Sequence, residues 1–366
     1  MKRKLMVGSV LVLMVGTAFL SWNWRNEARY SFKVRFEEVV DFGFEAFATG
    51  DWRNAEEILS SLFDKFGNEL NLFRKMDRSR QLKARSMYGY FLFRKGDFKK
   101  SERVWRPIFK NAESMNEFVQ SRKYQRKMLL FYLTDLAELK KSQELLRISN
   151  LCYDDRGNSS EILRKFGDSP LIRAMAGEAF YRSGAYEKAV AVLKIFSKKS
   201  RLNEKLDARR RATIRWYYVN SLICKEKGGV SEKNDLVQKV FAEFFDENMN
   251  ETKLFDDLST EDQIACRMTY AQLLLQSDDH EKILDLLDVF FDDDGQALQQ
   301  FKNPCEETII RSIYGYALWR CGEYASAKQI WYLFPEGWNE CLAKNVGLDE
   351  RDLLKLLREN IHRISI

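Results

Sequence analysis

Few residues of this chain have the types and spacing that catalysis or cofactor binding requires. The 366-residue sequence contains two histidines, His280 and His362, in unrelated surroundings. No Ser-His-Asp, Cys-His or H-E-x-x-H arrangement can be assembled around them, and no glycine-rich loop follows a strand pattern. The acidic run at residues 292–295 lacks the alternating ligands of a calcium loop, so we interpret it as a solvated connection between helices. The sequence therefore predicts no catalytic residues, no cofactor and no enzymatic activity.

The cysteines also offer no metal site. Six of them are scattered singly, without a C-x-x-C pair: Cys152, Cys224, Cys266, Cys305, Cys321 and Cys341. Their even number permits disulfides in an oxidising compartment. We favour the alternative that most of them are small buried apolar residues.

Three aromatic–arginine pairs indicate a different kind of chemistry. The pairs are Phe93-Arg94, Tyr181-Arg182 and Trp319-Arg320. A ring beside a guanidinium group suits apolar or acidic peptide segments, through stacking and paired hydrogen bonds to carboxylates. A structural alternative stays open, because arginine in the last turn of a helix also binds the free carbonyl groups there. Under that alternative the rings pack on the next helix pair and contact no ligand.

The elements that position these pairs form a repeat marked by two glycines seven residues apart. Four segments share this spacing and begin at Gly43, Gly89, Gly177 and Gly315. After the second glycine come an aromatic residue, a small residue and a large apolar residue at fixed positions. The second glycine suits the left-handed conformation that ends a helix. We expect the small residues to mark the closest approach of two helices, and the aromatic residue to pack between them.

This pattern resembles the tetratricopeptide repeat (TPR) family. The resemblance implies an all-α protein, a TPR-like α-solenoid of antiparallel helix pairs. Its four clear units begin 46, 88 and 138 residues apart, whereas a tandem array repeats about every 34 residues. We therefore expect degenerate units between them and about seven helix pairs in total. One such unit begins at Tyr270, with Ala271 and Asp278 in the two glycine positions.

The resemblance also implies which residues face a ligand. In this family, first-helix positions just before the second glycine, and those three residues earlier, tend to line the concave groove. The implied peptide groove contains Phe44, Tyr90, Phe93, Arg94, Tyr181, Arg182, Tyr316, Trp319 and Arg320.

Residues 1–24 are predicted to form an N-terminal transmembrane helix that serves as a signal anchor. Three basic residues precede an uncharged run from Leu5 to Leu20, and Trp22 and Trp24 follow where an interfacial belt is expected. Counting through Trp22 gives 18 residues, just above the lower limit of about 17 for a span. A cleaved signal peptide is the alternative. Either interpretation places the rest of the chain outside the cytoplasm.

The remaining chain is expected to hold a repeat domain at residues 30–345 and a capping helix at residues 346–366. Three of the 60 basic residues lie at positions 2–4, which leaves 57 against 54 acidic residues. This near balance predicts no nucleic-acid partner.

These observations predict a non-enzymatic scaffold or adaptor in an extracytoplasmic envelope complex. It would be a single-pass protein of the bacterial inner membrane, with its repeat domain on the periplasmic side. The expected partners are other proteins or peptides, with no small-molecule substrate. The alternative is a secreted or periplasmic peptide-binding protein whose signal peptide is removed.

Overall fold

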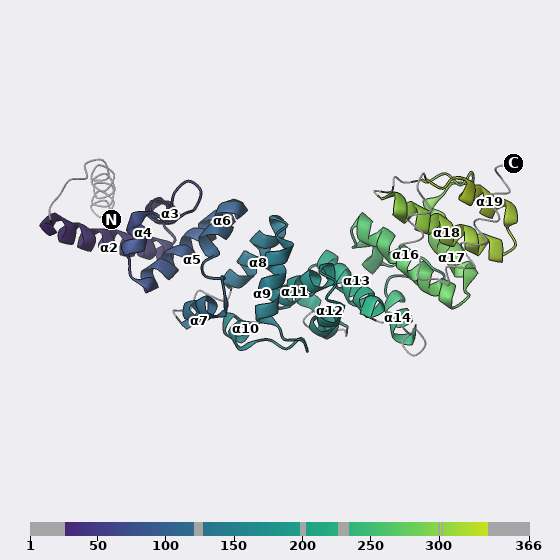
Figure 1. Cartoon of the computed structure of the whole chain (residues 1–366), viewed down its shortest axis with the longest axis horizontal. Helices are drawn as coiled ribbons and strands as arrows, with labels where there is room; N and C mark the ends of the chain where they lie inside the picture. The colour runs from purple at the N-terminus through teal and green to yellow at the C-terminus, as the bar shows by residue number, and fades with distance from the viewer. Residues whose placement is uncertain are drawn as a thin grey trace. The chain divides into compact units, whose positions relative to one another are not determined.

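The computed structural model describes residues 26–120, 127–197, 203–225, 234–298, 301 and 303–335. Over these residues the chain is all-helical, with no strand beyond four isolated bridges (Figure 1). The all-α prediction is therefore confirmed for the described part of the chain. The predicted anchor at residues 1–24 and the predicted capping helix at residues 346–366 lie outside it.

The chain divides into two compact units, Met1–Lys141 and Ser142–Ile366. The first contains α2 (Asn26–Thr49), α3 (Trp52–Ser60), α4 (Asn71–Lys75), α5 (Arg78–Arg94), α6 (Phe98–Trp105), α7 (Ala112–Gln120) and α8 (Met128–Glu138). The second contains α9 (Ser142–Cys152), α10 (Glu161–Phe166), α11 (Pro170–Arg182), α12 (Tyr186–Leu193), α13 (Ala208–Lys225), α14 (Asn234–Phe241), α15 (Lys253–Asp256), α16 (Thr260–Gln276), α17 (His280–Leu287), α18 (Pro304–Arg320) and α19 (Tyr324–Tyr332). Three short 3-10 helices, η2 (Lys194–Phe196), η3 (Asn203–Lys205) and η4 (Asp288–Phe290), also lie in the second unit.

Helix pairs are the building blocks of both units. The first unit holds the pairs α2–α3 and α5–α6, and the second holds α11–α12, α13–α14, α16–α17 and α18–α19. Helix α8 ends the first unit and α9 begins the second. The described residues thus contain six such pairs, against about seven expected.

The two glycine positions have the roles that the sequence indicated. All four second glycines have positive φ, and so does Asp278 in the degenerate unit, at 58°. The first glycine lies under a large apolar residue of the second helix, which is the repeat residue itself at Gly89, Gly177 and Gly315, and Ile58, one residue before it, at Gly43. An added Cβ on Gly43 would stand 2.8 Å from Ile58 Cγ2, and one on Gly89 would overlap the Trp105 ring. Only a missing side chain permits this approach.

The aromatic residue after the turn does not pack between the helices in every pair, so that expectation is wrong for Trp52 and Tyr324. Their exposed fractions are 51% and 56%. The turn places each ring against the edge of a first-helix aromatic residue. Trp52 meets Phe47 at a centroid distance of 5.3 Å, and Tyr324 meets Trp319 at 5.9 Å.

Four seven-residue loops with one shared geometry follow second helices, and the repeat pattern of the sequence did not predict them. These Asp loops are Phe63–Glu69, Tyr153–Ser159, Phe245–Glu251 and Phe291–Ala297, each closed by an isolated bridge. The second residue of each is an aspartate that accepts hydrogen bonds from backbone amides two and four residues later. Hydrogen bonding from Asn68 lowers the pKa of the first of these aspartates, Asp64.

Each Asp loop is bound by one arginine on the first helix that follows it. These loop-binding arginines are Arg85, Arg173, Arg267 and Arg311, always four residues before the first glycine position. The Arg311 guanidinium lies 4.8 Å from the Phe291 ring centroid and donates to the Gly295 carbonyl at 2.8 Å. Arg173 likewise lies over the Tyr153 ring and donates to the Gly157 carbonyl. Arg85 forms an ion pair with Glu69, and Arg267 forms one with Glu251.

We expect Arg311→Met to lower the free energy of unfolding by about 3 kcal/mol. The substitution leaves the Gly295 carbonyl and the Glu307 carboxylate without their hydrogen-bond donor. Urea unfolding followed by circular dichroism measures this loss. The matched control is Arg164→Met, which removes an exposed arginine from α10 of the same unit. Equal stability of the two variants would contradict a structural role for Arg311.

Candidate functional site

The predicted groove residues lie near the carboxyl ends of first helices. Phe44 is on α2, three residues are on α5, two on α11 and three on α18. Each of the two units therefore carries its own set of predicted groove residues.

In the first unit, rings from α2, α3, α5 and α8 form an aromatic row. Its members are Trp52, Phe47, Tyr90, Phe131 and Phe93, and their neighbouring centroids are 4.6–6.0 Å apart. All except Trp52 are half-buried, so each keeps part of its ring in contact with solvent. Two of the predicted groove residues, Tyr90 and Phe93, meet in this row through Phe131 of α8, a residue that no glycine pair marked.

Phe44 does not belong to this row. Its exposed fraction is 3%, and the Lys83 ammonium lies over its ring at 4.2 Å. Phe47, one turn later on α2, presents its ring instead. Arg94 is exposed and makes no hydrogen bond or ion pair with any described residue. Its guanidinium group, one residue after Phe93 on α5, is therefore available to a ligand.

In the second unit, Tyr181 and Arg182 take part in one cluster with α13. The ring of Tyr181 stacks on that of Tyr217 at 4.5 Å, and Asn220 Nδ2 donates to the Tyr181 hydroxyl at 2.7 Å. Arg182 donates to the Tyr217 hydroxyl at 3.1 Å and to Glu178 at 2.9 Å. Burial raises the pKa of Tyr181 to about 12, so the phenol stays protonated at neutral pH and acts only through hydrogen bonds.

A second cluster of this unit joins the start of α17 to α18. Arg320 donates to the Tyr316 hydroxyl at 3.0 Å and pairs with Asp278 at 3.0 Å. His280 Nε2 lies 2.7 Å from the same carboxylate, and its ring meets Tyr316 edge to face at 5.7 Å. Trp319 contacts Tyr324 rather than this cluster.

The charges decide what these surfaces can bind. Arg182 and Arg320 already have carboxylate partners within their own clusters, so an acidic peptide would have to displace Glu178 or Asp278. Arg94 has no such competitor. Together with its half-exposed rings, this makes the aromatic row of the first unit the candidate site. Apolar stacking is its main interaction and a single cationic contact supplements it.

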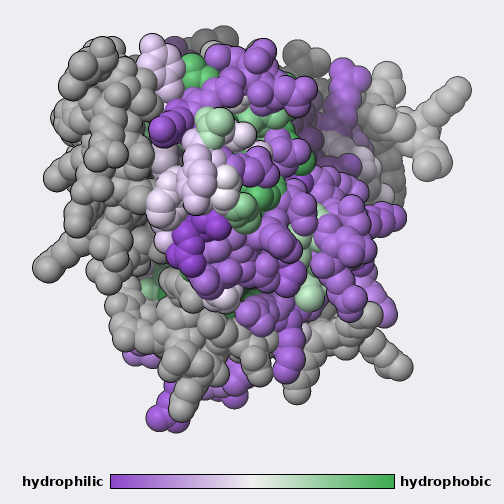
Figure 2. All heavy atoms as spheres, turned by 90° about the vertical axis from the view of Figure 1, so that its right-hand side faces the viewer, coloured by the Kyte–Doolittle hydropathy of each residue, from purple (hydrophilic) through white to green (hydrophobic). Residues whose placement is uncertain are grey.

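The surface at the carboxyl end of the described chain is different. It is mostly hydrophilic, interrupted by a small pale and green area (Figure 2). The exposed aromatic residues of α19 are single rings, Tyr324 and Tyr332, with exposed fractions of 56% and 69%.

No family model, curated protein or solved structure matches this chain. Among the described residues, no group of three or more histidine, cysteine or acidic side chains is placed to hold a metal ion. The same part of the chain contains no helix that is both long and apolar enough to cross a bilayer.

One buried acid in the first unit lies away from the row. Asp135 of α8 has an exposed fraction of 0%, and neither carboxylate oxygen has a hydrogen-bond partner among the described residues. The neighbouring Ser101 hydroxyl donates to the Gly89 carbonyl instead, at 3.0 Å. Burial, reinforced by the charge of Glu102, raises the pKa of Asp135 to about 7. Since no solvent reaches this carboxyl, its effect is on stability.

The folded chain therefore holds the Asp135 proton more tightly than the unfolded chain, whose pKa is near 3.8. Its contribution to stability is present below about pH 4 and is lost as pH rises to about 7, a loss on the order of a few kcal/mol. Asp135→Asn cannot ionise. Urea unfolding at pH 5 and pH 8 should show that the free energy of unfolding of the variant, relative to that of the wild type, is higher at pH 8.

The comparison of variant with wild type isolates Asp135. Arg106 and Lys141 hydrogen-bond to Glu102 and lower its pKa against the opposing effect of burial, and both proteins retain this group. Parallel stability–pH curves for the two proteins would refute the raised pKa.

Proposed function

We propose that this chain is a TPR-like helical repeat scaffold that binds segments of other proteins and has no enzymatic activity of its own. The aromatic row of the first unit carries this proposal. It offers a binding partner several adjacent rings on helices that are already packed, so little conformational entropy is lost on binding. Arg94, which follows Phe93 in α5 and is exposed, adds a guanidinium group.

The proposed location is the outer side of the bacterial inner membrane, with residues 1–24 as the anchor and the repeat body in an envelope complex. The uncharged run from Leu5 to Leu20 supports an anchor. Cys305 is disulfide-bonded, which supports an oxidising compartment. A secreted binding protein with its signal peptide removed would fit the same two observations.

Site-specific photocrosslinking tests the row. We expect p-benzoylphenylalanine at position 52, in place of Trp52, to capture one or a few defined proteins in native membranes. The matched control places the same group at Phe66, an exposed ring of the same unit in an Asp loop, with an exposed fraction of 56%. Adding Arg94→Ala should reduce capture at position 52 by about fivefold, a typical loss for one guanidinium contact. Identical captured proteins at positions 52 and 66, unaffected by Arg94→Ala, would refute the site.

Thiol alkylation followed by mass spectrometry tests the compartment. In protein taken from its native source, Cys305 should resist alkylation until a reductant is added, whereas exposed Cys321 should react at once. Alkylation of both cysteines without reductant would count against an oxidising location.

A further inference from the structure

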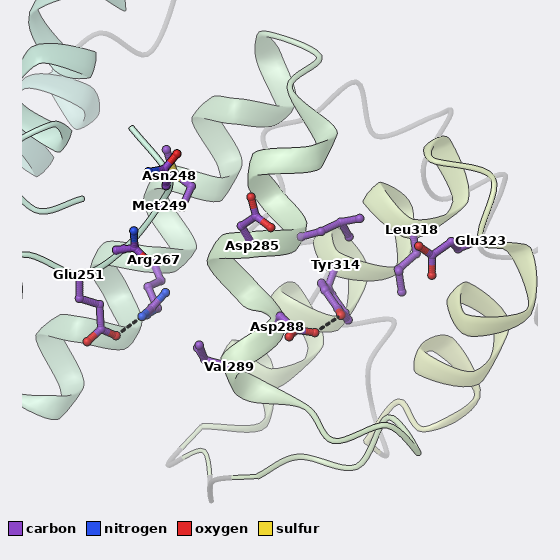
Figure 3. Close-up of a pocket in the computed structure, with 12 residues that line it drawn as sticks. Asn248, Met249, Glu251, Arg267, Asp285, Asp288, Val289, Tyr314, Leu318 and Glu323 are labelled. Carbon is purple, nitrogen blue, oxygen red and sulfur yellow. Dashed lines mark hydrogen bonds and ion pairs between the residues drawn. The ribbon is translucent and has the colours of Figure 1, made fainter. Parts of the chain in front are cut away.

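The second unit contains a cavity of about 740 Å³ that the proposed function does not use (Figure 3). Its walls come from the Asp loop Phe245–Glu251, from α17 and η4, and from α18. Figure 3 shows Asp285, Asp288 and Val289 along one wall and Tyr314 and Leu318 along another. Glu323, just before α19, completes the opening.

The cavity lies where this Asp loop departs from the other three. The fifth residue of the others is a glycine with positive φ, packed against the second helix of the next pair. An added Cβ on Gly157, for example, would stand 2.5 Å from the Ala191 carbonyl carbon. Here the residue is Met249, with φ at 60° and an exposed fraction of 7%. In the other three loops the glycine lets the loop backbone pack directly against a helix. The side chain of Met249 occupies that space here, and the cavity extends between this loop and α17.

Acidic side chains outnumber cations in the lining of the cavity. Arg267 is the only cation among its lining residues, and it is 5% exposed, with its guanidinium paired to Glu251 and donating to the Leu286 carbonyl. Three further carboxylates, of Asp285, Asp288 and Glu323, have no cationic partner among the lining residues. Asp288 accepts a hydrogen bond from the Tyr314 hydroxyl at 2.7 Å, which fixes one oxygen and leaves the other accessible.

Apolar atoms lie behind these carboxylates. Met249 and Leu318 are buried, and Leu284 is half-buried beside them. Acidic groups at the opening with apolar side chains behind them complement a cation on an aliphatic stem, which buries its methylene groups and keeps its charged end among oxygens.

We propose that this cavity binds lysine or arginine side chains of a partner protein, with the cation among Asp285, Asp288 and Glu323 and the aliphatic stem against Met249 and Leu318. The occupant is a basic segment of a polypeptide, because a space of 740 Å³ exceeds one side chain and admits the neighbouring backbone. This second binding site differs in charge from the aromatic row and does not depend on it.

Fluorescence anisotropy with a labelled tetralysine peptide tests the site, using the full chain at low ionic strength, where screening is weak. The cavity variant is Asp285→Asn, Asp288→Asn, Glu323→Gln. We expect its affinity for the peptide to fall about tenfold, because three exposed charge contacts are lost. Asparagine at position 288 still accepts the Tyr314 hydrogen bond, so the fold is retained, which circular dichroism verifies.

The control variant is Glu187→Gln, Asp293→Asn, Asp294→Asn, three exposed acids of the same unit outside the cavity. It changes the net charge equally and should bind within about twofold of wild type, since distant surface charges contribute little. Equal losses in both variants, or none in either, would overturn the proposal.

Two further measurements identify the occupant. Acetylation of the four peptide lysines should abolish binding, because the ammonium charges are removed. Spermine should compete only weakly, because it carries its cations on a linear chain and has neither a peptide backbone nor side chains. Displacement of the peptide by far less spermine than unlabelled tetralysine would overturn a protein partner. Replacing Trp52 should leave tetralysine binding unchanged, so failure of the aromatic row and failure of the cavity are distinguishable.

Discussion

The contact between an arginine and the loop before it joins successive helix pairs. In the described chain Arg85, Arg173, Arg267 and Arg311 each bind an Asp loop from the first helix that follows it. A guanidinium group suits this role because its planar face stacks on an aromatic ring while its edge donates several hydrogen bonds. The pair before and the pair after are thereby joined by directional contacts, which apolar packing alone does not provide.

Within each pair a second constraint operates. The large apolar residue of the second helix lies on the first glycine of the first helix, and the neighbouring small residue is fully buried, as at Ala55 and Ala189. These contacts fix how closely the two helices approach. The first helix then presents its carboxyl end and the residues just before the turn. The aromatic row of the first unit and both clusters of the second unit arise at this end because the turn repeats.

The two proposed sites use opposite properties of this framework. The aromatic row arises where α2, α5 and α8 place similar side chains side by side. The acidic cavity arises where the repeat is broken, at Met249 in a position that elsewhere holds glycine. A side chain at positive φ costs on the order of 1 kcal/mol, and such strain often accompanies a functional site.

The sequence by itself determined the helical class, the paired glycines and most first helices, because these depend on local conformation and on the periodic spacing of small and apolar residues. It also singled out Tyr90, Phe93 and Arg94 as groove residues, which stays a prediction. Only the tertiary structure buried Phe44 and exposed Trp52, and only it gave Arg320 its carboxylate partner Asp278. Those outcomes depend on contacts between residues such as Arg320 and Asp278, 42 positions apart, which no local pattern encodes. The loop-binding arginines and the cavity at Met249 follow the same rule, since each joins one helix pair to the next.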